Sequence, residues 1–164
     1  MINNFVDPYL SRLLYSSSAV VRGNGQPSSM MARMIASASA PRNAAAGLTG
    51  ILLHVDNCFI QVLEGPNEEL ERTFERICCD FRHENIKLID LTPVRERLFA
   101  EWSMACLSED EDTTVQLRDG LAEVQFLVGV NAREAVNRMR KLIDAQPEAG
   151  ATELPAPAVA ANYG

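Results

Sequence analysis

The chain has 164 residues, of which 47% are hydrophobic and 23% are charged, and this length and composition predict one soluble globular domain. They exclude a wholly disordered chain, a collagen-like repeat and a disulfide-dense mini-protein. Acidic residues outnumber basic ones by 22 to 15, which gives a net charge of −7. Because an acidic surface repels phosphate groups, neither nucleic acid nor an anionic membrane is an expected partner.

The four cysteines form no pattern that is typical of a metal site or a disulfide. Cys78 and Cys79 are adjacent and no Cys-x-x-Cys is present, so reduced thiols in a cytoplasmic protein are expected. The two histidines, His54 and His83, lack the spacing of metal ligands, so no metal is expected. No segment approaches the ~20 apolar residues of a membrane span, and no signal peptide is predicted.

The N-terminal third predicts a strand followed by a helix. The short apolar segment 10–15 is typical of a strand, and Ser28 or Ser29 is a suitable N-cap for a helix with an apolar stripe. Pro41 is expected to interrupt this helix, because an interior proline costs ~3 kcal/mol. Gly47 is a suitable residue to end it.

The next segment predicts a β-hairpin and a second helix. Strands at 49–55 and 58–63 are separated by Asp56-Asn57, two residues that tolerate the positive φ of a tight turn. Asn67 is the expected N-cap of the helix that follows. The apolar stripe of this helix is predicted to comprise Leu70, Phe74, Ile77, Cys78 and Phe81.

Two further strands are predicted at 86–91 and 102–107. The resulting order, βαββαββ, predicts an α+β, ferredoxin-like sheet with two helices on one face. Both faces of the strand at 58–63 are mostly apolar, so the second face must also be covered. We expect a pair of C-terminal helices that packs across this face or against a partner subunit.

The C-terminal part supplies such a pair. An acidic linker at 108–112 precedes an apolar segment at 115–128, and Asn131 is the expected cap of a further helix. Residues after Gln146 are rich in Pro, Ala and Gly and are expected to be disordered. These patterns divide the chain into an α+β domain at 1–107, a pair of capping helices at 108–146 and a tail at 147–164.

Four side chains are candidates for chemistry, although each also has a purely structural interpretation. Gln61 is an amide flanked by apolar neighbours and needs a hydrogen-bond partner, which a nearby backbone group could supply. Tyr15 could be a core aromatic residue with its hydroxyl at the surface. Trp102 and Met104 lie two residues apart, hence on one face of the predicted strand, where plain core packing would also place them.

Several motifs together resemble the BLUF family of flavin-based blue-light sensors, in its short single-domain form. The resemblance runs in order through about three-fifths of the chain, from Leu10 to Leu107, and it agrees with the ferredoxin-like order predicted above. The matching motifs are Leu13-Leu14-Tyr15-Ser16, Asn43-x-x-x-Gly47-Leu48-Thr49-Gly50, Phe59-x-Gln61-x-Leu63-Glu64-Gly65, Ile77-x-x-Asp80-x-Arg82-His83 and Arg97-x-Phe99-x-x-Trp102-Ser103-Met104.

The resemblance implies a non-covalent flavin, FAD or alternatively FMN, between the two helices on one sheet face. It implies that Tyr15 donates an electron and a proton to the excited ring. Gln61 would lie between the phenol and the flavin, where rotation or tautomerisation of its amide rewires the hydrogen bonds.

Further roles are carried over residue by residue. Asn43 would bind the flavin edge, Arg82 and His83 would contribute to the flavin site, and Trp102 and Met104 would relay the signal. His83 could instead simply end a helix favourably. The sequence departs from the family pattern by a longer interval before Asn43 and by Pro41, which puts the contact of Asn43 in doubt.

The expected function is therefore a blue-light photoreceptor that is not an enzyme. Its signal would pass through the fifth strand to the C-terminal helices and then to a separate effector protein, and the receptor itself would form a homo-oligomer. The alternative is a light-insensitive ferredoxin-like interaction module. A flavoenzyme is a third interpretation, for which the adjacent Cys78 and Cys79 are the only sequence indication.

Overall fold

The computed structural model describes residues 9–20 and 27–146. The tail predicted at 147–164 lies outside the described residues. Within the described part, the elements occur in the order β1, α1, β2, β3, α2, β4, β5, α3 and α4. This order confirms the predicted α+β fold, with two helices after the fifth strand.

A five-stranded sheet forms the middle layer, with the strand order β4-β1-β3-β2-β5. The β1–β3, β1–β4 and β2–β3 pairs are antiparallel, whereas β2 and β5 are parallel. The strands are β1 (Leu10–Ala19), β2 (Thr49–Val55), β3 (Cys58–Pro66), β4 (His83–Pro93) and β5 (Ala105–Ser108).

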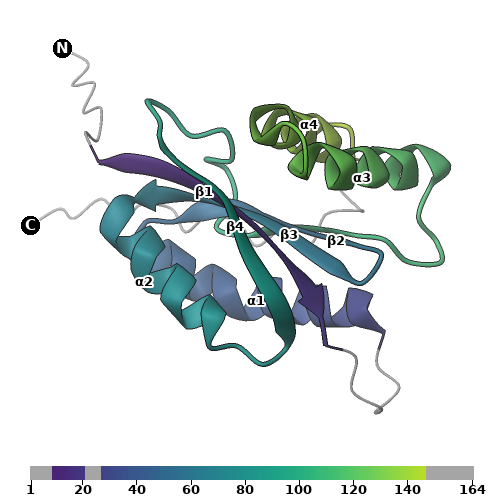
Figure 1. Ribbon diagram of the computed structural model, residues 1–164, viewed down its shortest axis with the longest axis horizontal. Helices are drawn as coiled ribbons and strands as arrows, with labels where there is room; N and C mark the ends of the chain where they lie inside the picture. The colour runs from purple at the N-terminus through teal and green to yellow at the C-terminus, as the bar shows by residue number, and fades with distance from the viewer. Residues whose placement is uncertain (1–8, 21–26, 147–164) are drawn as a thin grey trace, which may run out of the picture.

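Helices cover both faces of this sheet, as Figure 1 shows. The helices α1 (Ser28–Ala46) and α2 (Asn67–Cys78) lie on one face, and α3 (Val115–Val128) and α4 (Ala132–Asp144) lie on the other. Each face has its own apolar core. The predicted covering of the second face by a C-terminal helical pair is therefore confirmed.

The hairpin between β2 and β3 forms as the sequence predicts. Asp56 and Asn57 have φ values of 49° and 58°, the left-handed values that a two-residue turn of this type requires. The turn sets the register in which Leu52 lies opposite Gln61. Asp56 and Asn57 at the turn therefore determine where β3 begins and which residue of β2 lies opposite Gln61.

The first helix differs from the prediction in two ways. It continues without a break through Pro41, and its N-cap is Pro27 rather than a serine. The missing N–H of Pro41 leaves only the carbonyl of Ser37 without its helical donor, and Ser37 is exposed, so water can replace that donor. Gly47, with φ of 70°, ends the helix as predicted.

The second helix is shorter than its apolar stripe suggested. It ends at Cys78, which is exposed, and Phe81 lies beyond its end with 82% of its surface exposed. The inclusion of Cys78 and Phe81 in a buried stripe was therefore wrong. Asn67 is the first helical residue rather than the cap, and its side chain bonds Glu71.

The fifth strand also begins later than predicted, at Ala105 instead of Trp102. Irregular turns precede it, so the alternation of a strand does not apply there. Trp102 packs in the core beneath α3 and α4, whereas Met104 packs in the core beneath α1 and α2. The expectation that these two side chains share one face was therefore wrong.

The C-terminal helices agree with their prediction. Asn131 caps α4 by accepting a hydrogen bond from the backbone N–H of Glu134. The helix buries Ala135, Val136, Met139, Leu142 and Ile143. None of the helices in the described ranges is both long and apolar enough to cross a membrane.

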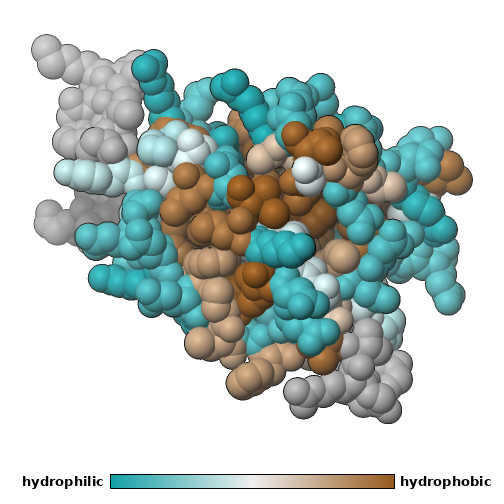
Figure 2. Space-filling model, viewed as in Figure 1, coloured by the Kyte–Doolittle hydropathy of each residue, from teal (hydrophilic) through white to brown (hydrophobic). Residues whose placement is uncertain are grey.

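The strand β4 forms an open edge of the sheet. It pairs with β1 on one side, and apolar surface lies over it in the middle of the view in Figure 2. Leu88 and Leu91 contribute to the exposed apolar surface of this strand, with 48% and 39% of their surfaces exposed. Such an edge offers unpaired backbone groups and apolar side chains to another chain.

Candidate functional site

A cavity of about 310 Å³ lies between α1, α2 and the sheet face beneath them. This volume is at the lower end of the range for small-molecule sites, roughly 300–1,000 Å³. Its walls combine apolar side chains with amides, cations and one phenol. The lining residues that matter here are Tyr15, Ile35, Arg42, Asn43, Leu52, Phe59, Gln61, Leu63, Arg76, Ile77, Asp80, Arg82 and His83.

Tyr15 and Gln61 form the polar centre of the cavity floor. They are directly opposite each other on β1 and β3, and the Tyr15 hydroxyl donates a hydrogen bond to Gln61 Oε1. Both are buried. Burial raises the pKa of Tyr15 far above its usual value, with smaller contributions from Asp80 and Cys78, so the phenol keeps its proton at neutral pH.

The other end of the Gln61 amide contacts a sulfur atom. Gln61 Nε2 donates to Met104 Sδ at 3.3 Å. The buried amide is thus held by two side chains, and not by the backbone group that its structural interpretation suggested. Because a thioether can accept but cannot donate a hydrogen bond, this contact fixes which end of the amide faces Tyr15.

Asn43 lies at the end of α1 and lines the cavity. Its Nδ2 donates to the backbone oxygen of Ser103 at 3.0 Å. The side chain is buried, and the helix around Pro41 is continuous, so Pro41 does not remove Asn43 from the cavity. Asn43 therefore joins α1 to the segment that precedes β5.

Charged groups gather at the rim. Arg82 donates to Asp80, from Nε to Oδ1 at 2.9 Å, and this pairing lowers the pKa of Asp80. Arg42 and Arg76 are two further cations in the cavity lining. The sequence pattern did not indicate these last two, although Arg76 lies three residues after Thr73, which also lines the cavity, on one face of α2.

His83 lines the cavity but has partners at both ring nitrogens. Nε2 lies 2.9 Å from the carbonyl oxygen of Ile77, and Nδ1 lies 2.8 Å from the hydroxyl of Ser17. Because a carbonyl only accepts, Nε2 carries the hydrogen and a neutral ring accepts from Ser17 at Nδ1. His83 therefore links the end of α2 to β1. Its contact with the Ile77 carbonyl lies at the end of the helix, where the sequence analysis also considered a structural role for His83.

The cavity does not contain Trp102. The structure brings Met104 to Gln61, but Trp102 lies on the opposite face of the sheet, beneath α4. Five of the predicted site residues thus line the cavity, Met104 lies beside it in contact with Gln61, and Trp102 lies away from it. Among the described residues, no cluster of three or more His, Cys, Asp or Glu side chains is suited to a metal ion.

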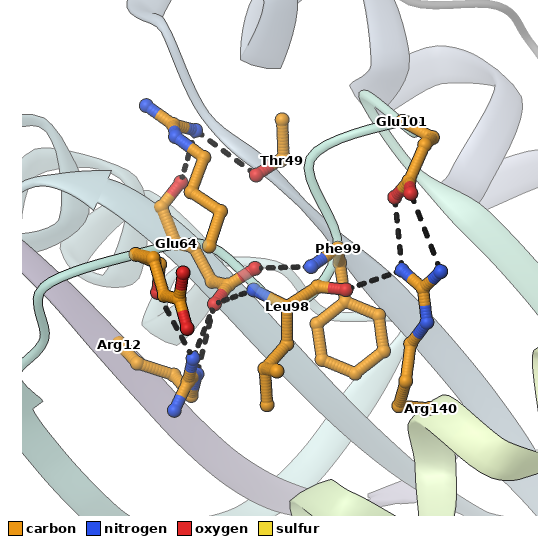
Figure 3. A network of polar contacts seen from close by, with 9 residues as sticks. Arg12, Thr49, Glu64, Leu98, Phe99, Glu101 and Arg140 are labelled. Carbon is orange, nitrogen blue, oxygen red and sulfur yellow. Dashed lines mark hydrogen bonds and ion pairs between the residues drawn. The ribbon is translucent and has the colours of Figure 1, made fainter. Parts of the chain in front are cut away.

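A buried carboxylate that sequence reasoning missed lies on β3, the strand that also carries Gln61, and Figure 3 shows its contacts. Glu64 is fully buried on β3, bonds Arg12 at 2.9 Å, and accepts the backbone N–H groups of Leu98 and Phe99 at 2.9 and 2.7 Å. The signal was available in the sequence, since a carboxylate within an apolar strand requires donors. Glu64 fixes the segment that leads to Met104.

This donor set suits a planar ring with polar edges that also carries anionic groups. Apolar side chains such as Leu52 and Phe59 can contact a ring face, and the amides of Asn43 and Gln61 can pair with ring edges. Arginines at the rim suit phosphate oxygens, because the guanidinium fork matches their geometry.

Comparison with known proteins gives one consistent result. Residues 10–105 match the family described as "BLUF: Sensors of blue-light using FAD". The chain is 35% identical to a photoactivated adenylate cyclase subunit beta of Euglena gracilis over 85 residues, which is 51% of this chain but 10% of that protein. The chain therefore spans a small part of the length of such curated relatives.

Two solved structures resemble nearly the whole described fold. One, "BlrB - a BLUF protein, dark state structure", is 31% identical, with a TM-score of 0.66 over 84% of this chain and 97% of that chain. The other, "BlsA photo-activated state", is 27% identical, with a TM-score of 0.68 over 84% of this chain and 96% of that chain.

Proposed function

Because the chain belongs to the BLUF family, the sensors of blue light using FAD, we propose that its cavity between α1 and α2 is the light-sensing site. The observation that supports this best is the buried pair of Tyr15 and Gln61 on the cavity floor. Residues 1–107 then act as the sensory domain and residues 108–146 as the output helices.

The cavity residues fit FAD by their chemistry. Asn43 and Gln61 offer both amide donors and acceptors to the edges of a flavin ring, and Tyr15 lies beside them. Arg82 is paired with Asp80 at the rim of the cavity. His83, in the cavity wall, is fixed by hydrogen bonds with the Ser17 hydroxyl and the Ile77 carbonyl. FMN carries the same ring and a phosphate, so the same residues suit it.

Bound FAD supplies the absorption of blue light and, while excited, an acceptor for one electron. Tyr15 would be the donor of that electron, and its phenolic proton would move from Oη along the hydrogen bond to Gln61 Oε1. The hydrogen bond that already joins these two atoms supplies the path for the proton. To take its neutral imidic form, Gln61 would keep this proton at Oε1 and give one of its two Nε2 protons to the group that has accepted the electron, whereas rotation of the amide would need the proton to return from Oε1 to Tyr15.

Rotation of the Gln61 amide would break its contact with Met104. After rotation, Gln61 Oε1 would face Met104 Sδ, and no hydrogen bond can form between two acceptors. Met104 is therefore released from Gln61. Segment 98–104, which Asn43 holds at Ser103, then carries the change toward α3 and α4.

The output is proposed to be an interaction with an effector protein. Relatives named photoactivated adenylate cyclases join a similar segment to an enzyme, which supports an effector downstream of this segment. The proposed contact surface is α3, where Val115 and Phe126 are 70% and 69% exposed. The sensory domain itself performs no catalysis in this proposal.

A homo-oligomer is proposed through the open edge at β4. Leu88 and Leu91 expose apolar surface there, and an edge strand can pair with a second copy of itself. Multi-angle light scattering of the full chain would give its mass. An Asp in place of Leu88 should lower that mass to one chain if β4 is the interface.

The decisive experiment is an absorption spectrum of the full chain supplied with FAD, in darkness and after blue light. We expect a flavin spectrum that shifts slightly to the red on illumination and relaxes in the dark. A bound flavin that only bleaches would indicate redox chemistry without sensing. Failure to bind FAD at all would leave the light-insensitive interaction module.

A further inference from the structure

Trp102, the only tryptophan of the chain, is held by a cation from α4. The guanidinium carbon of Arg140 lies 5.0 Å from the centre of the Trp102 ring, over its face. Trp102 is 9% exposed. A cation over an indole face is attracted by the negative face of the ring, so Arg140 favours this position of the indole.

The same guanidinium has polar partners both in segment 98–101 and on α4, and Figure 3 shows its contacts with Leu98 and Glu101. Nη1 and Nη2 bond the two carboxylate oxygens of Glu101 at 2.9 and 3.2 Å, and Nη1 also donates to the carbonyl oxygen of Leu98. Nε bonds Asp144 on α4 itself at 2.9 Å. Arg140 thus fastens α4 to residues 98, 101 and 102 at once.

The other end of this segment contacts two residues that line the cavity. Ser103 accepts from Asn43, and Met104 accepts from Gln61. Only one residue separates Trp102 from Met104, yet their side chains pack on opposite faces of the sheet. A displacement of Met104 must therefore act on the backbone that carries Trp102.

We propose that Arg140 is a positioning residue that holds Trp102 on the α4 side of the sheet and transmits movement of segment 98–104 to α4. The proposal rests on the proposed function, in which Gln61 releases Met104. When Trp102 moves, Arg140 loses the ring face and its contacts with Leu98 and Glu101 are strained. The end of α4 near Asp144 then loses its attachment to the sheet.

The test compares Arg140→Gln with Arg140→Lys and with the matched control Arg138→Gln. Arg138 lies on the same helix and bonds Glu123 of α3 at 2.8 Å, so it tests helix packing without segment 98–104. Lysine keeps the charge but lacks the planar fork that both stacks and binds two oxygens, so it should rescue only in part.

The first readout is the fluorescence of Trp102 in the dark, in the flavin-loaded full chain. Arg140→Gln should make displacement of Trp102 from its place beneath α4 about two- to five-fold more favourable, the factor that corresponds to an exposed cation–π contact. The emission and its quenching by acrylamide should change accordingly. Arg138→Gln should leave both unchanged.

The second readout is hydrogen exchange of α4 in darkness and under blue light. The wild type should show faster exchange near Asp144 in light, and Arg140→Gln should show the faster rate already in darkness. The light-induced red shift of the flavin should persist in this variant. The rate of dark recovery should change by a similar two- to five-fold factor.

Several outcomes would overturn the proposal: unchanged Trp102 emission in Arg140→Gln, an equal effect of Arg138→Gln, or complete rescue by lysine. If Arg140→Gln does not fold, Glu101→Gln weakens the same anchor without altering α4, and unchanged emission there has the same meaning. A wild type without a red shift would refute the proposed light sensing, whereas the dark fluorescence would still test the role of Arg140.

Discussion

Tyr15 and Gln61 face each other in register across β1 and β3, with the phenol donating to the amide oxygen. A sheet register, rather than a loop, therefore sets the geometry of this pair. Neighbouring strands hold such a pair with little freedom, which suits a proton transfer that requires a fixed donor and acceptor.

Replacing Tyr15 with Phe removes the donor and keeps the ring. We expect the variant to bind flavin, to lose the red-shifted state, and to be less stable by about 1–3 kcal/mol because Gln61 Oε1 loses its partner. Absorption spectra and chemical denaturation measure these effects. The exposed Tyr9→Phe is the matched control, and a normal red shift in Tyr15→Phe would refute the assigned donor.

Replacing Gln61 with Leu removes both hydrogen bonds of the amide. The protein should remain yellow with bound flavin and should lose the light-induced shift, because no group is left to rearrange. Difference spectra before and after illumination measure the shift. Gln125→Leu, on α3, serves as the control, and a full shift in Gln61→Leu would contradict the amide mechanism.

Replacing Glu64 with Gln tests the buried network around this carboxylate. Arg12 would lose its charged partner, and one amide end would face the N–H groups of Leu98 or Phe99. We expect a loss of about 3–5 kcal/mol in the free energy of unfolding. Urea denaturation measures it, with the exposed Glu123→Gln as the control, for which a change under about 1 kcal/mol is expected.

His54 should make stability depend on pH. It is buried on β2, with Nε2 2.7 Å from the Ser28 hydroxyl and Nδ1 3.1 Å from that of Ser108. Burial lowers its pKa below the usual 6.5, although Glu109 and Asp56 act in the opposite direction. The unfolded chain therefore binds this proton at a higher pH than the folded chain does.

The His54 contribution to stability is thus complete above pH 6.5 and is lost as the pH falls from there through the lower folded pKa. The melting temperature of the wild type, measured from pH ~8 to pH ~5, should fall more steeply on the acid side than that of His54→Gln. Equal slopes for the two proteins would contradict this prediction, because they would show that the pKa of His54 is the same in the folded and the unfolded chain.

The sequence predicted the layers well because the relevant signals are local. Asp56-Asn57 specifies its own turn, and Asn131 caps its own helix. Tyr15, Asn43, Gln61, Arg82 and His83 all line one cavity. Their placement agrees with the family resemblance, while their roles toward FAD remain predictions.

The differences arise where tertiary contacts override local rules. Pro41 stays within a helix because the carbonyl it deprives of a donor is at the surface. Trp102 and Met104 were placed on one face by assuming a strand, but the strand begins only at Ala105. Arg140 could not be predicted, because its partners lie about forty residues earlier, in an irregular segment.

The opposite placement of Trp102 and Met104 has a consequence for protein engineering. Under the proposed function, substitutions beside Met104 should act first on the contact with Gln61 and tune the colour response. Substitutions beside Trp102 should act first on α4 and tune how strongly illumination changes that helix. Both kinds of substitution should change the lifetime of the lit form, because one backbone segment carries both side chains.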